Sequence, residues 1–212
     1  MRVLVVTAVP AERDAVTRAC PAALDVLVGG VGPAAAAAAT GAALSRTPYD
    51  LVVSAGIGGG FQPTAPVGAL VVASRIVAAD LGADTPEGYL DVEALGFGRS
   101  AHLPPERTAR AIAEATGAVY GPVLTVSTVT GTAARAAELA ARHPGAAAEA
   151  MEGFGVAEAA AQQGVPVLEI RAVSNAVGPR DRSAWRIGDA LGALTDAFGK
   201  LPPVLESWNG HD

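Results

Sequence analysis

Short runs of residues with high strand propensity alternate along the chain with alanine-rich stretches of helical length. This alternation is typical of an α/β fold built on a largely parallel or mixed sheet. The predicted strands are Arg2–Thr7, Leu24–Val28, Asp50–Ala55, Gly68–Ala73, Val119–Ser127 and Val165–Ser174. The predicted helices are Ala11–Arg18, Pro33–Leu44, Glu106–Thr116, Thr132–Arg142, Glu152–Gln163 and Ser183–Phe198.

The longest stretch without a strand or helix pattern is Asp80–Pro105, which is rich in Gly, Pro and Asp. A loop of that length inside a compact domain is usually functional or mobile. The 212 residues show no internal repeat and no linker, and a chain of this length suits one large domain. We therefore expect a single domain over residues 1–212.

Charge and hydropathy restrict the partners of the chain. A net charge of −6 without a basic stripe argues against nucleic acid. No apolar run approaches the roughly 20 residues of a membrane span, and residues 1–6 enter a strand without a signal-peptide pattern. The one cysteine, Cys20, leaves no intramolecular disulfide to form and suits a reducing compartment. We expect a soluble cytoplasmic protein that binds neither nucleic acid nor membranes.

The three histidines, His102, His143 and His211, are far apart in the sequence and follow no metal-ligand spacing. Surface or loop roles account for them more simply. We expect no metal ion and no cofactor.

Four segments follow predicted strands, where ligands collect in open α/β sheets. The first is Thr7–Glu12. Glu12 falls in the first turn of a predicted helix, where the helix dipole alone favours a carboxylate. The functional interpretation is a general base that activates water.

The second and third segments, Gly29–Ala35 and Ala55–Gly60, are rich in glycine. Gly30, Gly32 and Ala35 satisfy a loose G-x-G-x-x-A pattern. However, the pattern does not follow the first strand, and no acidic residue follows the next strand, so it is a weak sign of a dinucleotide site. The P-loop pattern is absent. These glycines allow either close approach of the backbone to a ligand or ordinary tight turns.

The fourth segment is split between Ala150–Gly153 and Ile170–Asn175. Glu152 opens a predicted helix and Asn175 ends the last predicted strand. A carboxylate can accept two adjacent hydroxyls of a ribose, and an amide offers a donor and an acceptor to a purine edge. Taken alone, Glu152 is more often a carboxylate at a helix N-terminus and Asn175 a turn former, so their value lies in the combination.

Taken in order, the chain resembles the nucleoside phosphorylase and hydrolase superfamily, in its methylthioadenosine/S-adenosylhomocysteine nucleosidase-like branch. The similar stretches are Ala8–Glu12, Gly30–Ala39, Ser54–Pro63 with Val67–Val72, Ala150–Glu152 and Arg171–Asn175. Within that branch the chain is most similar to the futalosine hydrolase family, through Ala79–Ala83, Leu95–Gly98 and Ser174–Asp181. The resemblance implies a three-layer α/β/α sandwich with a central mixed, largely parallel sheet.

The resemblance also implies roles for individual residues. Glu12 takes the position of the glutamate that activates the attacking water, Glu152 that of the ribose-binding glutamate, and Met151 packs on the sugar. Three further residues take positions that line the base and sugar pocket, namely Ile57, Gly58 and Gly59. Ile57 departs from the serine usual in adenine-specific relatives.

Asn175 is the most informative departure, because adenine-specific relatives carry an aspartate there. An asparagine cannot give a proton to N7, but its NH₂ can donate to O6 or N7 of hypoxanthine. Adenine presents an amino donor at position 6, and an unpaired buried polar group costs about 1–3 kcal/mol. Hypoxanthine is also the better leaving group. Asn175 therefore predicts a 6-oxopurine.

The implied activity is hydrolysis of the N-glycosidic bond of futalosine to hypoxanthine and dehypoxanthinyl futalosine, in an alternative menaquinone pathway. Futalosine carries a benzoate-bearing tail, which an arginine fork suits. Arg180 and Arg182 are candidates for that contact, with Trp185 or Phe97 as aromatic walls, although a solvated loop and core aromatics explain them equally well. The base-stacking residue is expected within Val126–Gly131.

Three other functions remain open at this point. A purine nucleoside phosphorylase needs arginines for phosphate, and none lies in Gly29–Ala39 or Ala55–Gly60. A methylthioadenosine/S-adenosylhomocysteine nucleosidase is disfavoured by Asn175. A nucleoside-sensing binding module would not need a water-activating base such as Glu12. The resemblance further implies a homo-oligomer.

Overall fold

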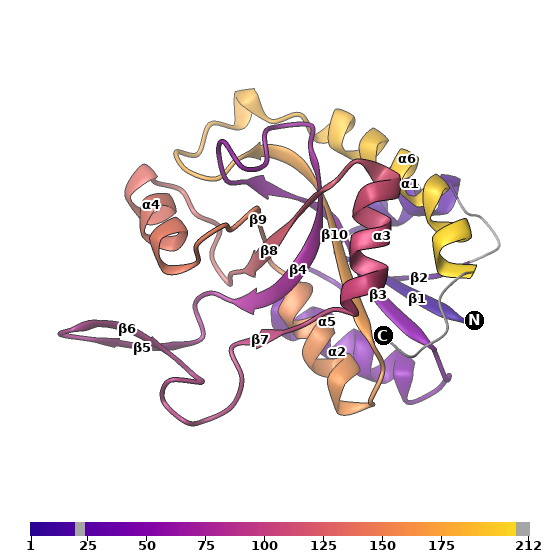
Figure 1. Ribbon diagram of the computed structural model, residues 1–212, viewed down its shortest axis with the longest axis horizontal. Coiled ribbons are helices and arrows are strands. Elements are labelled where there is room, and N and C mark those ends of the chain that lie inside the picture. The colour runs from indigo at the N-terminus through magenta and orange to yellow at the C-terminus, as the bar shows by residue number, and fades with distance from the viewer. Residues whose placement is uncertain (20–23, 207–212) are drawn as a thin grey trace.

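The computed structural model describes residues 1–19 and 24–206, so Cys20 and His211 lie outside the described residues. Within these ranges an eight-stranded mixed sheet forms the centre of the molecule (Figure 1). Its strands are β1 (Val3–Thr7), β2 (Asp25–Val28), β3 (Leu51–Gly60), β4 (Leu70–Ala78), β7 (Ala101–His102), β8 (Val119–Thr125), β9 (Ala148–Ala150) and β10 (Val167–Ala176).

The sheet is largely parallel, as predicted. Strand β1 runs parallel to β2 and β3, β3 to β10, β4 to β8, and β8 to β9. The antiparallel pairs are β10–β4, β3–β9 and β4–β7. Because β10 pairs with both β3 and β4, the strands β10, β4, β8, β9 and β3 form a closed ring of pairings.

Helices cover the sheet on two sides, which confirms the three-layer arrangement. Helices α1 (Pro10–Ala19), α3 (Glu106–Thr116) and α6 (Ile187–Glu206) pack over one apolar cluster that contains Val16, Ile112 and Phe198. Helices α2 (Pro33–Leu44) and α5 (Gly153–Gln162) pack over a second cluster that contains Ala36 and Val156. Figure 1 shows these two groups on opposite sides of the strands.

Helix α2 illustrates how the sequence determines an element. Pro33 occupies the first turn, where its missing N–H is not needed, and the alanines that follow have the highest helix propensity. The small side chains also allow close packing. Gly155 of α5 lies so near α2 that a Cβ there would collide with the carbonyl oxygen of Pro33.

Several elements differ from the sequence prediction. Residues 80–105, expected to be irregular, contain the hairpin β5 (Gly82–Thr85) and β6 (Gly88–Asp91), which projects from the body in Figure 1, and also β7. Helix α6 begins at Ile187 after a short 3₁₀ turn, Arg182–Ala184. Helix α4 (Ala133–Arg142) matches its prediction within one residue.

Strand β3 is longer than predicted, because it continues through Gly56–Gly60. The prediction that Ala55–Gly60 follows a strand was therefore wrong. These glycines stay extended because they pair with β10 on one side and, at Gly59 and Gly60, with β9 on the other. No helix in the described part of the chain is long and apolar enough to span a membrane.

Candidate active site

A pocket of about 350 Å³ lies where β1, β3 and β10 end. The structure brings most of the predicted site residues together in its lining, namely Glu12, Ile57, Gly58, Gly59, Met151, Glu152, Asn175, Arg180 and Trp185. Two predicted residues lie outside that lining, Phe97 and Arg182. Phe97 is 82% exposed, in the segment that follows the β5–β6 hairpin.

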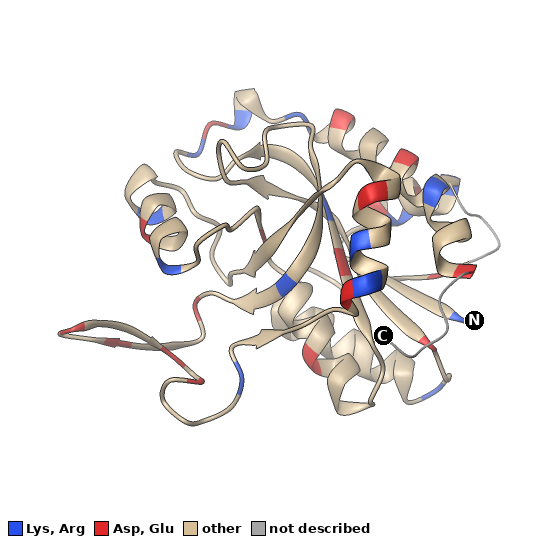
Figure 2. Ribbon diagram, in the orientation of Figure 1, with Lys and Arg blue, Asp and Glu red and all other residues tan. Residues whose placement is uncertain are grey.

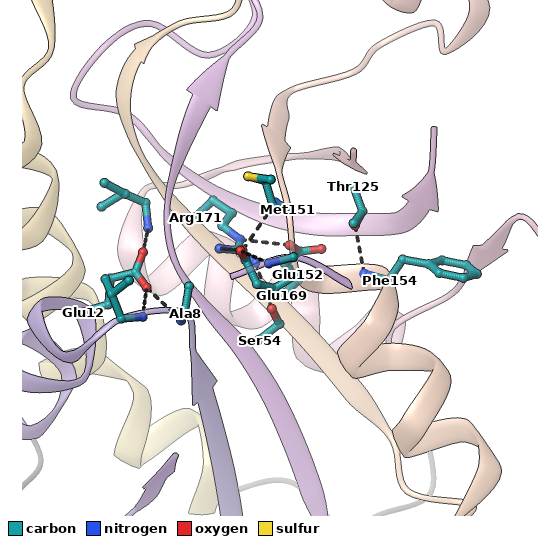
Figure 3. Close-up of polar contacts among 12 residues, drawn as sticks. Ala8, Glu12, Ser54, Thr125, Met151, Glu152, Phe154, Glu169 and Arg171 are labelled. Atoms are coloured by element: carbon teal, nitrogen blue, oxygen red, sulfur yellow. Dashed lines mark hydrogen bonds and ion pairs between the residues drawn. The ribbon is translucent and has the colours of Figure 1, made fainter. Parts of the chain in front are cut away.

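Glu12 is buried in the first turn of α1, and three backbone amides fix its carboxylate. The N–H groups of Ala8 and Val9 donate to Oε2 at 2.9 and 3.2 Å, and the N–H of Ile57 donates to Oε1 at 2.9 Å (Figure 3). A carboxylate has about four lone-pair positions. Glu12 therefore keeps about one position free to accept a hydrogen bond from a water molecule in the pocket.

Glu152 is also buried and held by three donors. Gly32 N–H donates to Oε1 at 3.2 Å, while Met151 N–H and Arg171 Nη1 donate to Oε2 at 3.3 and 3.2 Å. Gly32 adopts φ 92°, a conformation that favours glycine. The glycine segment before α2 thus orients a carboxylate of the pocket.

Arg171 lies beneath the pocket on β10 and is 1% exposed. Its Nε donates to Glu169 Oε1 at 2.9 Å and its Nη2 to Ser54 Oγ at 3.0 Å, in addition to the bond with Glu152 (Figure 3). Burial lowers the pKa of Arg171, but the surrounding carboxylates outweigh burial and raise it. Burial raises the pKa of Glu169, against the opposing charge of Arg171.

Gly56 lies between the side chains of Glu12 and Arg171. A Cβ on Gly56 would lie 2.5 Å from Glu12 Oε1 and 2.8 Å from Arg171 Nη1. Side chains essentially never approach that closely, so only glycine lets Glu12 and Arg171 approach the strand together. Gly56, within the buried strand β3, is therefore required for the geometry of this site.

Asn175 lies near the end of β10, over Gly59. Its Oδ1 accepts from Ser174 Oγ at 2.9 Å, and its Nδ2 donates to the carbonyl oxygen of Ala176 at 3.0 Å. Since an amide nitrogen carries two hydrogens, one N–H of Asn175 remains for a ligand. Ser174, which sequence reasoning left out, thus orients the amide.

The segment expected to contact the base, Val126–Gly131, contributes Val129 and Thr130 to the pocket. Thr130 also bonds Glu149 of β9, since its N–H donates to Oε1 at 2.8 Å and its hydroxyl to Oε2. Glu149 is 4% exposed and lines the pocket. Burial raises the pKa of Glu149, against the hydrogen bonds from Thr130.

At the outer end of the pocket, Arg180 stacks on Trp185, with its guanidinium carbon 5.5 Å from the ring centroid. Arg182 lies 5.8 Å from the same ring but outside the pocket lining. Of the four residues considered for the tail, the structure thus brings only Arg180 and Trp185 to the pocket.

The sequence did contain a sign of the residues that were missed. Glu169 and Arg171 are charged residues within an apolar strand, Val167–Ala176, and charged side chains are almost never fully buried unless paired. Among the described residues no group of three or more His, Cys, Asp or Glu is arranged to hold a metal ion.

The sequence profile of the phosphorylase superfamily matches residues 24–201. A futalosine hydrolase of Streptomyces coelicolor is 65% identical, with all of both chains covered. A futalosine hydrolase of Acidothermus cellulolyticus is 47% identical over 93% of this chain and 89% of the relative.

Solved structures show the same fold at much lower identity. The 5′-methylthioadenosine/S-adenosylhomocysteine nucleosidase of Colwellia psychrerythraea, in complex with adenine, superimposes with a TM-score of 0.75 at 22% identity. The alignment covers 94% of this chain and 97% of that chain. The chain therefore belongs to the phosphorylase superfamily and, within it, to the futalosine hydrolase family.

Proposed function

We propose that this protein is an N-glycosyl hydrolase that cleaves futalosine to hypoxanthine and dehypoxanthinyl futalosine, a step of the alternative menaquinone pathway. The observation that carries the proposal is the pairing of two fixed carboxylates, Glu12 and Glu152, with the amide of Asn175 in one pocket. Full-length identity of 65% to a futalosine hydrolase supports the same substrate.

Glu12 is the general base in this mechanism. Its free lone-pair position accepts a hydrogen bond from water and then takes the proton as the water oxygen attacks the anomeric carbon. Three backbone donors hold the carboxylate before the substrate arrives. The water is therefore oriented without reorganisation of the protein, which favours the reaction.

Glu152 holds the ribose. About one lone-pair position remains, on Oε1, and it accepts a ribose hydroxyl, while Met151 packs beside the sugar. Arg171 anchors the carboxylate from below at 3.2 Å. The sugar is thus positioned with its anomeric carbon toward Glu12 as the ribosyl group develops oxocarbenium-ion character.

Asn175 acts on the departing base. When the glycosidic bond breaks, its electron pair goes to the purine, and the free N–H of Asn175 stabilises the developing charge at O6 or N7. Asn175 gives the departing hypoxanthine no proton, because an amide has none to give. The base leaves as an anion and takes a proton from water, and Glu12 returns the proton it accepted to solvent. At the outer end of the pocket, Arg180 stacks on Trp185 and binds the carboxylate of the substrate tail.

A panel of substrates tests this function. Futalosine, inosine and methylthioadenosine are incubated with the protein, with and without added phosphate, and the released base is measured by chromatography. We expect hypoxanthine from futalosine at a rate that phosphate does not change. Release that requires phosphate identifies a phosphorylase, and adenine from methylthioadenosine as the main product identifies an adenine nucleosidase. Tight binding without release identifies a sensor.

We also propose that the protein is a cytoplasmic homo-oligomer. The family resemblance and the single cysteine support this. Light scattering of the purified protein measures its mass against the 21.0 kDa of one chain, and cell fractionation measures its location. A mass of one chain, or recovery with membranes, contradicts the respective part of the proposal.

A further inference from the structure

Glu149 is a buried carboxylate in the pocket to which the mechanism above gives no role. It is 4% exposed, and in the described part of the chain no lysine or arginine forms an ion pair with it. Thr130 donates one hydrogen bond to each carboxylate oxygen. Since a carboxylate offers about four lone-pair positions, each oxygen can accept about one bond more.

The sheet register places Glu149 and Asn175 on either side of one glycine. Strand β3 runs between β9 and β10, and its Gly59 pairs with Glu149 on one side and with Asn175 on the other. Directly opposed residues of neighbouring strands project to the same face of a sheet. Both side chains therefore project to the face of the sheet that forms the pocket.

Gly59 lets neighbouring side chains approach this face of β3 closely. A Cβ there would lie 2.9 Å from Val177 Cγ2 and 3.3 Å from Asn175 Nδ2, so a side chain at this position would crowd the amide. The absence of a side chain thus lets Val177 and the amide of Asn175 lie close to the backbone of β3. Glu149 and Asn175 line the same pocket, so the edge of one bound purine can be directed toward both groups.

The donors and acceptors along the edge of the base determine which purine Glu149 and Asn175 can bind together. Hypoxanthine presents acceptors at O6 and N7 and a donor at N1–H. Adenine presents an amino donor at position 6 and an acceptor at N1. The free N–H of Asn175 suits O6 or N7, but an acceptor is needed at N1, and a carboxylate is an acceptor only.

We propose that Glu149 is a specificity-determining residue that accepts the N1–H of hypoxanthine while Asn175 donates to O6 or N7. This inference rests on the proposed function, since it names a contact to the base released there. A carboxylate facing the N1 lone pair of adenine is unfavourable. Loss of one such matched bond changes affinity about 10- to 100-fold.

The environment of Glu149 predicts that binding of the two bases depends on pH. Burial raises its pKa, with Asp80 acting in the same direction and the charge of Arg135 and the Thr130 bonds opposing it. As pH falls, a protonated Glu149 loses an acceptor for N1–H and gains a donor for the N1 of adenine. Hypoxanthine binding therefore weakens and adenine binding strengthens on acidification.

Calorimetric titration of the full-length protein with free hypoxanthine and free adenine tests this. The variants are Glu149→Gln and Glu149→Ala, with Glu106→Gln as matched control, because Glu106 is exposed on α3 and pairs with Arg110. We expect both Glu149 variants to lose hypoxanthine affinity about 10- to 100-fold while adenine affinity stays or rises. The opposed pH trends should disappear in Glu149→Gln, an isosteric change, and persist in the control.

An unchanged ratio of hypoxanthine to adenine affinity in folded Glu149→Gln would overturn the inference, whatever the enzyme cleaves. Equal loss of both bases would also overturn it, since that result indicates a structural role only. Binding of the base is measured apart from turnover. Hypoxanthine selectivity without cleavage of futalosine would therefore contradict the proposed function and leave this inference standing.

Discussion

At the scale of residues, the pocket depends on carboxylates fixed by donors that belong to other segments. Glu12 is held by backbone amides from its own loop and from β3. Glu152 is held by Gly32 and Arg171. The sequence predicted both glutamates and Asn175, since their positions at strand ends are visible in the pattern. It could not predict the donors, because those contacts join residues far apart in the chain.

Glu12→Gln removes the proposed general base with little change in shape. We expect turnover of futalosine to fall roughly 10²- to 10⁴-fold, as for loss of general base catalysis, with substrate binding largely kept. Steady-state kinetics and substrate titration measure the two effects separately. Full activity in Glu12→Gln would rule out the assignment of Glu12 as the base.

Gly56→Ala inserts a methyl group between Glu12 and Arg171. Because that Cβ would lie 2.5 Å from Glu12 Oε1, the carboxylate must move, and a displacement of about 1 Å can reduce turnover roughly 10²-fold. The control is Gly41→Ala on α2, where no atom lies within 4 Å of the new Cβ. We expect the control to keep its activity and to gain about 0.5–1 kcal/mol of stability. Equal activity of both variants contradicts the expectation.

The raised pKa of Glu149 also affects stability. The pKa of Glu149 is raised in the folded state by burial, so its contribution to stability is full at low pH and is lost as pH rises through the folded value. Because glutamine does not ionise, the Glu149→Gln variant does not lose this stability as pH rises. Chemical unfolding of both proteins should show the variant gaining stability relative to the wild type from mildly acidic to neutral pH. A constant difference across that range would exclude a raised pKa.

At the scale of elements, the sequence predicted six helices and six strands of the described structure, because each carries a helix-forming or apolar run. It missed β5, β6, β7 and β9, which have two to four residues each and, unlike the equally short β2 (Asp25–Val28), contain no run of three apolar β-branched or leucine residues. It also ended β3 too early, since glycine has low strand propensity. Glu149 was also missed, because it lies on β9, and the pairing of that strand depends on the tertiary fold.

Helices α2 and α5 pack closely because Gly155 has no side chain. In Gly155→Ala the new Cβ collides with the carbonyl oxygen of Pro33, so the helices must separate, and overpacking of this kind costs about 1–3 kcal/mol. Gly192→Ala on α6 is the control, with open space around its Cβ. Thermal unfolding should show destabilisation only in the first variant. The same melting temperature for both would contradict close packing at Gly155.

At the scale of the whole molecule, the α/β sandwich brings the ends of β1, β3 and β10 together, and the pocket lies there. The sequence predicted the fold class from alternation alone and the family from its motifs. It placed Phe97 and Arg182 with the pocket, but the structure leaves both outside its lining, since loop position depends on packing that no local pattern records. The single domain over residues 1–212 remains a prediction.

Hydrolysis of futalosine by water is tested most directly with isotope-labelled solvent. The protein is incubated with futalosine in H₂¹⁸O in the absence of phosphate, and the products are weighed by mass spectrometry. We predict unlabelled hypoxanthine and one ¹⁸O atom at the anomeric carbon of the sugar product. No base release until phosphate is added, with a sugar phosphate as product, would contradict hydrolysis.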